Sequence, residues 1–314
     1  MISNPEGTTA LSSLGWVDHD GLWRFNAASG ETDTIPLRTG GRCSSLHYLG
    51  SDRFAVAHHF EGRRFEVSVR SFSSPGDVLA DAVLDNGTNS VAGEPATWSG
   101  VPLLYVEYLH IAPWNDFVLL RISPSTGKFE IQRLQWYGDS YDKGYQGVID
   151  VLALPGGTCA LVSVQRSSRL ILHDLETGTQ KRSIDLGGHG GNPRLALHDS
   201  GKEVWASDYD TLVVLGTTTW QVLRSARLQN AFTGTQQFIG DFSFAADQAL
   251  CAVARPFNGD VVAVDLASLR IKSSAKLGRQ PLEAVALPGG KIVARDWKTG
   301  DLLLGTLERR WFVG

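Results

Sequence analysis

Residues 150–157 read DVLALPGG, and residues 283–290 repeat this string almost unchanged as EAVALPGG. Residues 193–202, PRLALHDSGK, follow the same pattern, an alternating apolar run that ends in a turn containing glycine. Such twofold alternation is typical of a β-strand with one buried face. Each copy is followed by two further strand-like runs and by a fourth, more polar run, so the pattern indicates a repeated unit of four strands.

This unit recurs over most of the chain. Complete copies can be placed at about residues 43–84, 93–136, 148–186, 193–228 and 239–277. Residues 12–37 add about three strands, and residues 282–314 add three or four. Repeats of about 40 residues, each forming one small sheet, are typical of β-propellers, where the sheets are arranged as blades around an axis.

The sequence therefore predicts an all-β fold, with residues 1–314 forming a single β-propeller of seven blades; six blades is the alternative. Both terminal units are incomplete, so we expect strands from the two termini to close the ring, which leaves only short, protected edges. In particular, Leu302, Leu304 and Leu307 are expected to pair with strands near the N-terminus.

Several strings within residues 148–307 support a resemblance to a known repeat family. The strings are Gly-Asn-Pro at 191–193, HDSGK at 198–202 and LVVL at 212–215, with weaker matches at 261–266 and 170–175. These units resemble the YVTN-type propeller repeats, a family close to the lactonase-like propellers of bacteria. The resemblance covers about half the chain and implies a propeller fold, but propellers carry unrelated functions.

Composition excludes two classes of partner. The formal net charge is −4 and the isoelectric point is near 6.1, and no basic stripe is present, which argues against nucleic acid as a partner. No apolar run approaches the roughly 20 residues of a membrane span. The first ten residues do not resemble a secretory signal, and the three cysteines are an odd number, far apart. We therefore expect reduced thiols and a cytoplasmic protein.

The candidate site lies where a propeller gathers its blade-linking segments and the turns between second and third strands, around the central channel. His59 and His110 are the candidates for general acid and base, and Glu94 or Glu283 would orient them or hold a metal. The residues predicted to bind a ligand at the same channel mouth are His19, His189, Arg42, Arg194, Trp114 and Trp297.

The cofactor is left open. Imidazole and carboxylate groups converging at one channel mouth could hold a divalent metal ion. However, the closely spaced Cys and His residues of a zinc signature are absent. His58 and His59 are adjacent, and neighbouring strand residues point to opposite faces, so we expect one of them to reach the channel mouth and the other to pack between blades.

Two functions follow from these residues. The first is a propeller that binds a protein, a peptide or a small polar ligand on its turn-rich face, where aromatic and Arg side chains would make the contacts. The alternative is an enzyme that acts on a small polar substrate at the channel mouth. A lyase, a lactonase or a related hydrolase, with or without a metal, would fit that description.

Overall fold

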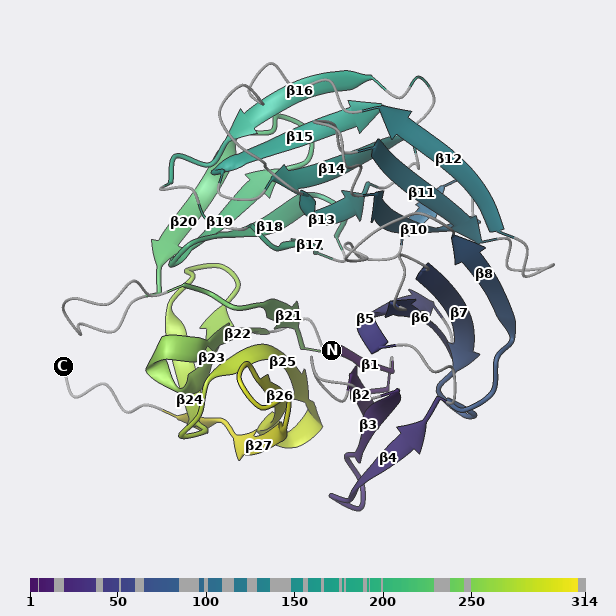
Figure 1. Ribbon diagram of the computed structural model, residues 1–314. Coiled ribbons are helices and arrows are strands. Elements are labelled where there is room, and N and C mark those ends of the chain that lie inside the picture. The colour runs from purple at the N-terminus through teal and green to yellow at the C-terminus, as the bar shows by residue number, and fades with distance from the viewer. Residues whose placement is uncertain are drawn as a thin grey trace.

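Figure 1 shows the computed structural model of the protein. The structure describes residues 1–4, 6–13, 20–37, 42–50, 52–59, 65–84, 96–98, 101–108, 116–122, 129–135, 148–154, 158–164, 167–174, 177, 179–188, 191, 193–198, 200–228, 238–245 and 250–309.

The described strands form seven antiparallel sheets, numbered here in chain order. Sheet 1 is β1 (Ile2–Ser3), β2 (Thr9–Ser13), β3 (Gly21–Asn26) and β4 (Thr32–Pro36); sheet 2 is β5 (Arg42–Gly50), β6 (Arg53–His59), β7 (Phe65–Ser71) and β8 (Ala80–Leu84). Sheet 3 is β9 (Ala96–Trp98), β10 (Val101–Tyr108), β11 (Asp116–Ile122) and β12 (Phe129–Gln135); sheet 4 is β13 (Val148–Ala153), β14 (Cys159–Val164), β15 (Arg169–Asp174) and β16 (Gln180–Asp185).

Sheets 5 to 7 are formed by the C-terminal part of the chain. Sheet 5 is β17 (Leu195–Leu197), β18 (Glu203–Asp208), β19 (Thr211–Gly216) and β20 (Val222–Arg227). Sheet 6 is β21 (Phe242–Phe244), β22 (Leu250–Arg255), β23 (Asp260–Asp265) and β24 (Ile271–Lys276), extended at its outer edge by β28 (Glu308–Arg309); sheet 7 is β25 (Pro281–Leu287), β26 (Lys291–Asp296) and β27 (Leu302–Thr306).

The predicted repeat boundaries are confirmed for the five central units, which correspond to sheets 2 to 6. The N-terminal unit was underestimated, because sheet 1 has four strands and begins at Ile2 rather than near residue 12. The reason is physical: β1 is two residues long, too short to show alternation. The described helical segments are single 3₁₀ turns, η2 (Pro256–Asn258) and η3 (Pro288–Gly290). A bilayer-spanning helix is therefore absent from the described residues.

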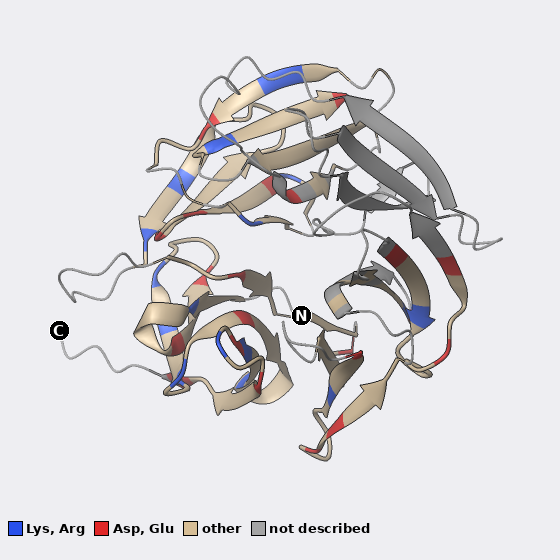
Figure 2. Ribbon diagram, in the orientation of Figure 1, with Lys and Arg blue, Asp and Glu red and all other residues tan. Residues whose placement is uncertain are grey.

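The sheets follow one another around a common centre (Figure 1). First strands such as β13, β17 and β21 lie toward that centre, and fourth strands such as β16 and β20 lie at the periphery. Burial follows the same order: β19 is buried at five of its six residues, whereas β16 is exposed at five of six. Figure 2 shows Lys and Arg on these peripheral strands, where charged side chains remain hydrated.

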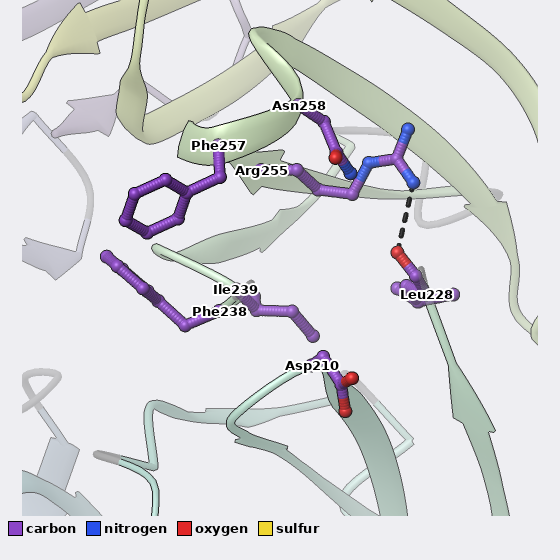
Figure 3. A pocket seen from close by; sticks show the side chains of 7 residues that line it. All are labelled: Asp210, Leu228, Phe238, Ile239, Arg255, Phe257 and Asn258. Carbon is purple, nitrogen blue, oxygen red and sulfur yellow. Dashed lines mark hydrogen bonds between the residues drawn. The ribbon is translucent and has the colours of Figure 1, made fainter. Parts of the chain in front are cut away.

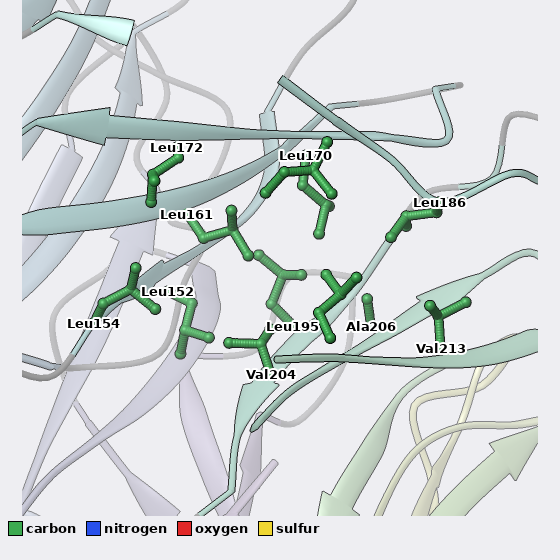
Figure 4. Close-up of a cluster of buried hydrophobic side chains, with 12 residues drawn as sticks. Leu152, Leu154, Leu161, Leu170, Leu172, Leu186, Leu195, Val204, Ala206 and Val213 are labelled. Atoms are coloured by element: carbon green, nitrogen blue, oxygen red, sulfur yellow. The ribbon is translucent and has the colours of Figure 1, made fainter. Parts of the chain in front are cut away.

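Neighbouring sheets are joined face to face by buried apolar side chains. Between sheets 4 and 5, for example, Leu161 and Leu170 pack against Val204 and Val213, and each of the four is at most 1% exposed (Figure 4). Burying an aliphatic side chain of this size stabilises the fold by roughly 1.5–3 kcal/mol. Similar clusters link sheet 1 to sheet 2, sheet 5 to sheet 6 and sheet 6 to sheet 7. Packing between these neighbouring sheets therefore fixes their orientation relative to one another.

The first and last sheets also touch. Ala10 and Phe25 of sheet 1 share a buried cluster with Val285 and Val293 of sheet 7. The Lys291 ammonium donates a 2.7 Å hydrogen bond to the Ala27 carbonyl. The strand pairing predicted here was wrong, since β27 pairs with β26 and not with an N-terminal strand. Sheet 1 already has four strands of its own, so its contact with sheet 7 is made by side chains.

Candidate functional site

The predicted site residues are only partly described. His19, His110, His189, Glu94 and Trp114 lie outside the described residues. Arg42 and His59 are placed as opposite partners at the start of β5 and the end of β6. In sheet 7, Glu283 and Arg295 are opposite partners in the same way, and Trp297 follows β26. In an antiparallel pair, the start of the first strand lies beside the end of the second strand. These residues therefore lie at the same end of the strands in sheets 2 and 7.

Glu283 is held by two cations. Its carboxylate accepts hydrogen bonds from the Arg295 guanidinium and, at 2.7 Å, from the Met1 ammonium. Burial raises the pKa of Glu283, but these two positive charges lower it more, and the result lies well below the usual range. Glu283 therefore stays ionised and paired, an arrangement that suits a structural link between sheets 1 and 7. Its predicted catalytic role stays a prediction.

Charged residues mark the start of the first strand in four successive sheets. Asp150 lies in β13 and Arg194 directly before β17, and Asp241 and Glu283 occupy the corresponding places in sheets 6 and 7. The Asp150 carboxylate accepts a 2.8 Å hydrogen bond from the Leu195 amide of the next sheet. We call these four residues the inner charged row. One of its acids, Asp150, thus serves to join two sheets.

Asp241 differs from its neighbours in the row. Burial raises the pKa of its carboxyl group, the Arg194 charge lowers it, and the Glu283 charge raises it again, with a net increase. One carboxylate oxygen accepts a 2.8 Å hydrogen bond from the Phe242 amide. A half-buried acid with a raised pKa beside a cation is the kind of group that can transfer protons. Asp241 is therefore the described residue best suited to acid–base chemistry.

Three aromatic rings form a cluster at the same edge. Phe238 precedes β21, Phe257 lies in η2 after β22, and Trp297 follows β26. The ring centroids are 5.3 Å apart for Phe238–Phe257, 5.4 Å for Phe238–Trp297 and 6.0 Å for Phe257–Trp297, with edge-to-face geometry throughout. We call this cluster the aromatic patch. Phe257 is 43% and Trp297 37% exposed, so apolar surface from two sheets is presented to solvent together.

A small hollow adjoins the aromatic patch between sheets 5 and 6 (Figure 3). The space in it that a water molecule can reach is only about 10 Å³, and its lining includes Asp210, Phe238, Arg255 and Phe257. Pockets that enclose small-molecule ligands usually measure about 300–1,000 Å³. This hollow is far smaller, with room for about one water molecule, so it encloses neither a substrate nor a side chain of a partner.

One residue that lines the hollow, Arg255, belongs to a buried ion pair. Arg255 and Asp260 make two hydrogen bonds, of 2.8 and 2.6 Å, and their side chains are 3% and 1% exposed. Arg255 also donates to the Leu228 carbonyl at 3.0 Å (Figure 3). Each of the three guanidinium nitrogens therefore donates a hydrogen bond within the protein. Its role is to fix the turn that carries Phe257.

The described residues hold no metal site: no three His, Cys, Asp or Glu side chains gather among them. His58 is fully buried, which agrees with one of the two adjacent histidines packing inside the fold. All three cysteines are free; Cys43 and Cys251 are buried, and Cys159 is half-buried. Burial raises the pKa of the Cys43 thiol to about 12, so this thiol is unreactive at neutral pH.

Two buried histidines make stability depend on pH. Burial lowers the pKa of His58 to about 4, with a further contribution from the Arg70 charge, and burial alone lowers that of His173 to about 4. Between pH 4 and 6.5 the unfolded chain binds more protons at these sites, so stability is complete above pH 6.5 and falls as the pH drops. We expect His173 to contribute a loss of about 2 kcal/mol between pH 7 and 5.

Denaturant unfolding of wild type and His173→Gln across this pH range measures that contribution. The glutamine variant should have a shallower decline, because it carries no titratable group at this position. Parallel curves for the two proteins would contradict the expected burial of a neutral His173.

Sequence reasoning singled out Trp297 by its place in the repeat, but it missed Phe238. This residue precedes a three-residue first strand, in a link without an alternating pattern. The only signal in the sequence was that Phe238 is an aromatic residue shortly before the first strand of a repeat unit.

The fold has many solved relatives. The chain matches a β-propeller domain of Cps50 (Swd1) from Myceliophteria thermophila with a TM-score of 0.73 and 12% identity, covering 98% of this chain and 95% of that one. The chain has a β-propeller fold. It also matches the periplasmic gluconolactonase of Pseudomonas aeruginosa (TM-score 0.70, 16% identity, 96% and 94% covered). A chain in a mitotic checkpoint complex matches with a TM-score of 0.67 and 9% identity, covering 98% of this chain and 86% of that one.

The resemblance to lactonase-like propellers inferred from the sequence is thus confirmed for the fold. At these identities the likeness does not extend to function. No protein-family model matches the sequence. No curated protein matches it either.

Proposed function

We propose that the seven sheets are the blades of one ring formed by residues 1–314, and that this ring binds a protein or peptide partner on the face that carries the aromatic patch. The buried contact between sheets 1 and 7 supports the ring. Solved relatives that are parts of assemblies, such as the chain in the mitotic checkpoint complex, are compatible with a binding role.

The observation that carries this proposal is the exposed aromatic patch. Trp and other aromatic side chains dominate the energetics of protein interfaces, where they fill pockets on the partner. Phe257 and Trp297 hold each other through Phe238, so little side-chain entropy remains to be lost when a partner binds.

A peptide-display selection against the purified protein tests the proposal. We expect selected peptides to bind the double variant Phe257→Ala/Trp297→Ala at least about tenfold more weakly than wild type, because both substitutions remove apolar contact area. Val222→Ala/Leu223→Ala is the matched control, since these side chains are 45% and 53% exposed on the peripheral strand β20. Equal losses in both variants, or no loss in the first, would contradict the proposal.

One observation favours the enzymatic alternative, a hydrolase or lyase acting on a small polar substrate. Asp241 has a raised pKa and lies near the Arg194 charge, and one solved relative is a gluconolactonase. If this alternative holds, the protein hydrolyses glucono-δ-lactone above the spontaneous rate, and Asp241→Asn lowers that rate about 10²–10⁴-fold. Arg279→Gln, at an exposed ion pair, should leave it unchanged. Equal rates for wild type and Asp241→Asn would end the alternative.

A further inference from the structure

Among the described residues, sheet 7 has no fourth, outer strand, unlike the other sheets. Sheets 1 to 6 each contain at least four strands, but only β25, β26 and β27 form sheet 7 among the described residues. In sheets 4, 5 and 6 the third strand lies between two neighbours and is mostly buried, as in β19 and β23. The third strand of sheet 7, β27, has one strand neighbour in the part of the chain that the structure describes, and its residues are half-buried or exposed.

The sequence of β27 is that of an interior strand. It reads LLLGT and carries no charge, whereas the outer strands β16 and β24 read QKRSID and IKSSAK. Leu304 is 50% exposed. An apolar strand with an open edge is the situation that proteins normally prevent with charges or a covering segment. The apolar composition of β27 therefore indicates that another strand covers its edge.

The hydrogen-bond pattern shows which backbone groups are available. The Asp296 amide donates to the Asp301 carbonyl, and the Leu307 amide donates to the Gly290 carbonyl, so both pairs are of the hydrogen-bonded type. Because the two types alternate along an antiparallel pair, Leu303 and Gly305 point their backbone groups toward β26. Leu302, Leu304 and Thr306 consequently point their N–H and C=O groups away from β26, toward the open edge.

The two faces of β27 are already in contact with protein. Leu303 packs against the cluster shared by sheets 6 and 7, and Leu302 packs against the cluster shared by sheets 7 and 1. A Cβ atom at Gly305 would lie 2.7 Å from Leu277, which shows how closely sheet 6 approaches. The free part of β27 is therefore its edge, and a strand is the element that fits there.

We propose that the open edge of β27 binds an extended segment of a partner protein, which adds a fourth strand to sheet 7. The other outer strands indicate the chemistry of this segment: about five or six residues, polar and basic. Its buried side chains should be small, as Ser273 and Ala275 are in β24. The chain leaves β27 at once for sheet 6, where β28 pairs with β24. The described residues that directly follow β27 are therefore paired elsewhere and do not cover its edge.

Amide hydrogen exchange tests this proposal with a synthetic peptide that copies residues 269–277. In the free protein, the amides of Leu302, Leu304 and Thr306 should exchange at least about 100-fold faster than those of Leu303 and Gly305. Saturating peptide should slow the first three by at least about tenfold. A control peptide with proline at the positions of Ser273 and Ala275 should have no effect, because it cannot form the ladder.

Two variants at one position separate backbone pairing from side-chain contact. Leu304→Pro removes an outward N–H without breaking the ladder to β26, and should weaken peptide binding at least about tenfold. Leu304→Thr keeps the N–H and should bind within about threefold of wild type. Equal binding by Leu304→Pro and wild type, or no change in β27 exchange at saturating peptide, would overturn the proposal.

Slow exchange of the outward amides in the free protein would overturn it as well. If deleting residues 310–314 restored fast exchange, the occupant would be the chain's own segment. If dilution restored it, the occupant would be a second copy of the chain.

Discussion

Gly240→Ala is expected to destabilise the folded protein by about 3 kcal/mol, or to prevent folding, because the new Cβ atom has no space. Gly240 precedes β21, and an ideal Cβ there would lie 2.3 Å from the Leu282 carbonyl oxygen in β25. The obstructing atom belongs to the backbone of the adjacent sheet, so it cannot move as a flexible side chain would. The substitution would push sheet 6 away from sheet 7 at the edge that carries the candidate site.

Urea unfolding of the variant measures this effect, and Gly76→Ala is the matched control. An ideal Cβ at Gly76 has only one neighbour, 4.0 Å away. We expect the control to change stability by no more than about 0.5 kcal/mol. Similar stabilities for the two variants would contradict the close approach of sheets 6 and 7.

Asp260→Asn is the second substitution with a large expected effect, a loss of about 3–5 kcal/mol. The loss arises because the Arg255 guanidinium would remain buried without its counter-charge, next to the turn that carries Phe257. The expected result is a lower unfolding midpoint in urea together with weaker binding by the aromatic patch.

Asp33→Asn is the control for this pair. Arg24 and Asp33 also make two hydrogen bonds, but their side chains are 39% and 51% exposed. Water already solvates both groups, so the control should cost less than about 1 kcal/mol. A cost as large as that of Asp260→Asn would mean that burial does not determine the strength of these pairs.

The repeat could be predicted from sequence because its signal is local. Alternating apolar residues and glycine turns identify each strand, and copies such as those at residues 150–157 and 283–290 reveal the period. Strand partners at the ends of the chain could not be predicted in this way. The pairing of β28 with β24 depends on which edge lies nearby in space, and no property of residues 308–309 specifies it.

The sequence could predict where the candidate site lies in the fold, but not the contacts that its residues make. The position of Glu283 in its repeat placed it at the start of a first strand, but its pairing with the Met1 ammonium joins positions 282 residues apart. Phe257 and Trp297 were recognisable as aromatic residues at equivalent turns. Their edge-to-face contact through Phe238 requires the packing of sheet 6 on sheet 7, which single repeats do not contain.

Oxidative footprinting of the protein with and without a selected peptide tests the binding proposal most directly. The account predicts that saturating peptide slows oxidation of the exposed Trp297 and Phe257 side chains at least about fivefold, because bound partners exclude water from interface aromatic residues. Leu223, which is 53% exposed on β20, should be oxidised at an unchanged rate. Protection of Leu223 with unchanged oxidation of Trp297 and Phe257 would contradict a binding site at the aromatic patch.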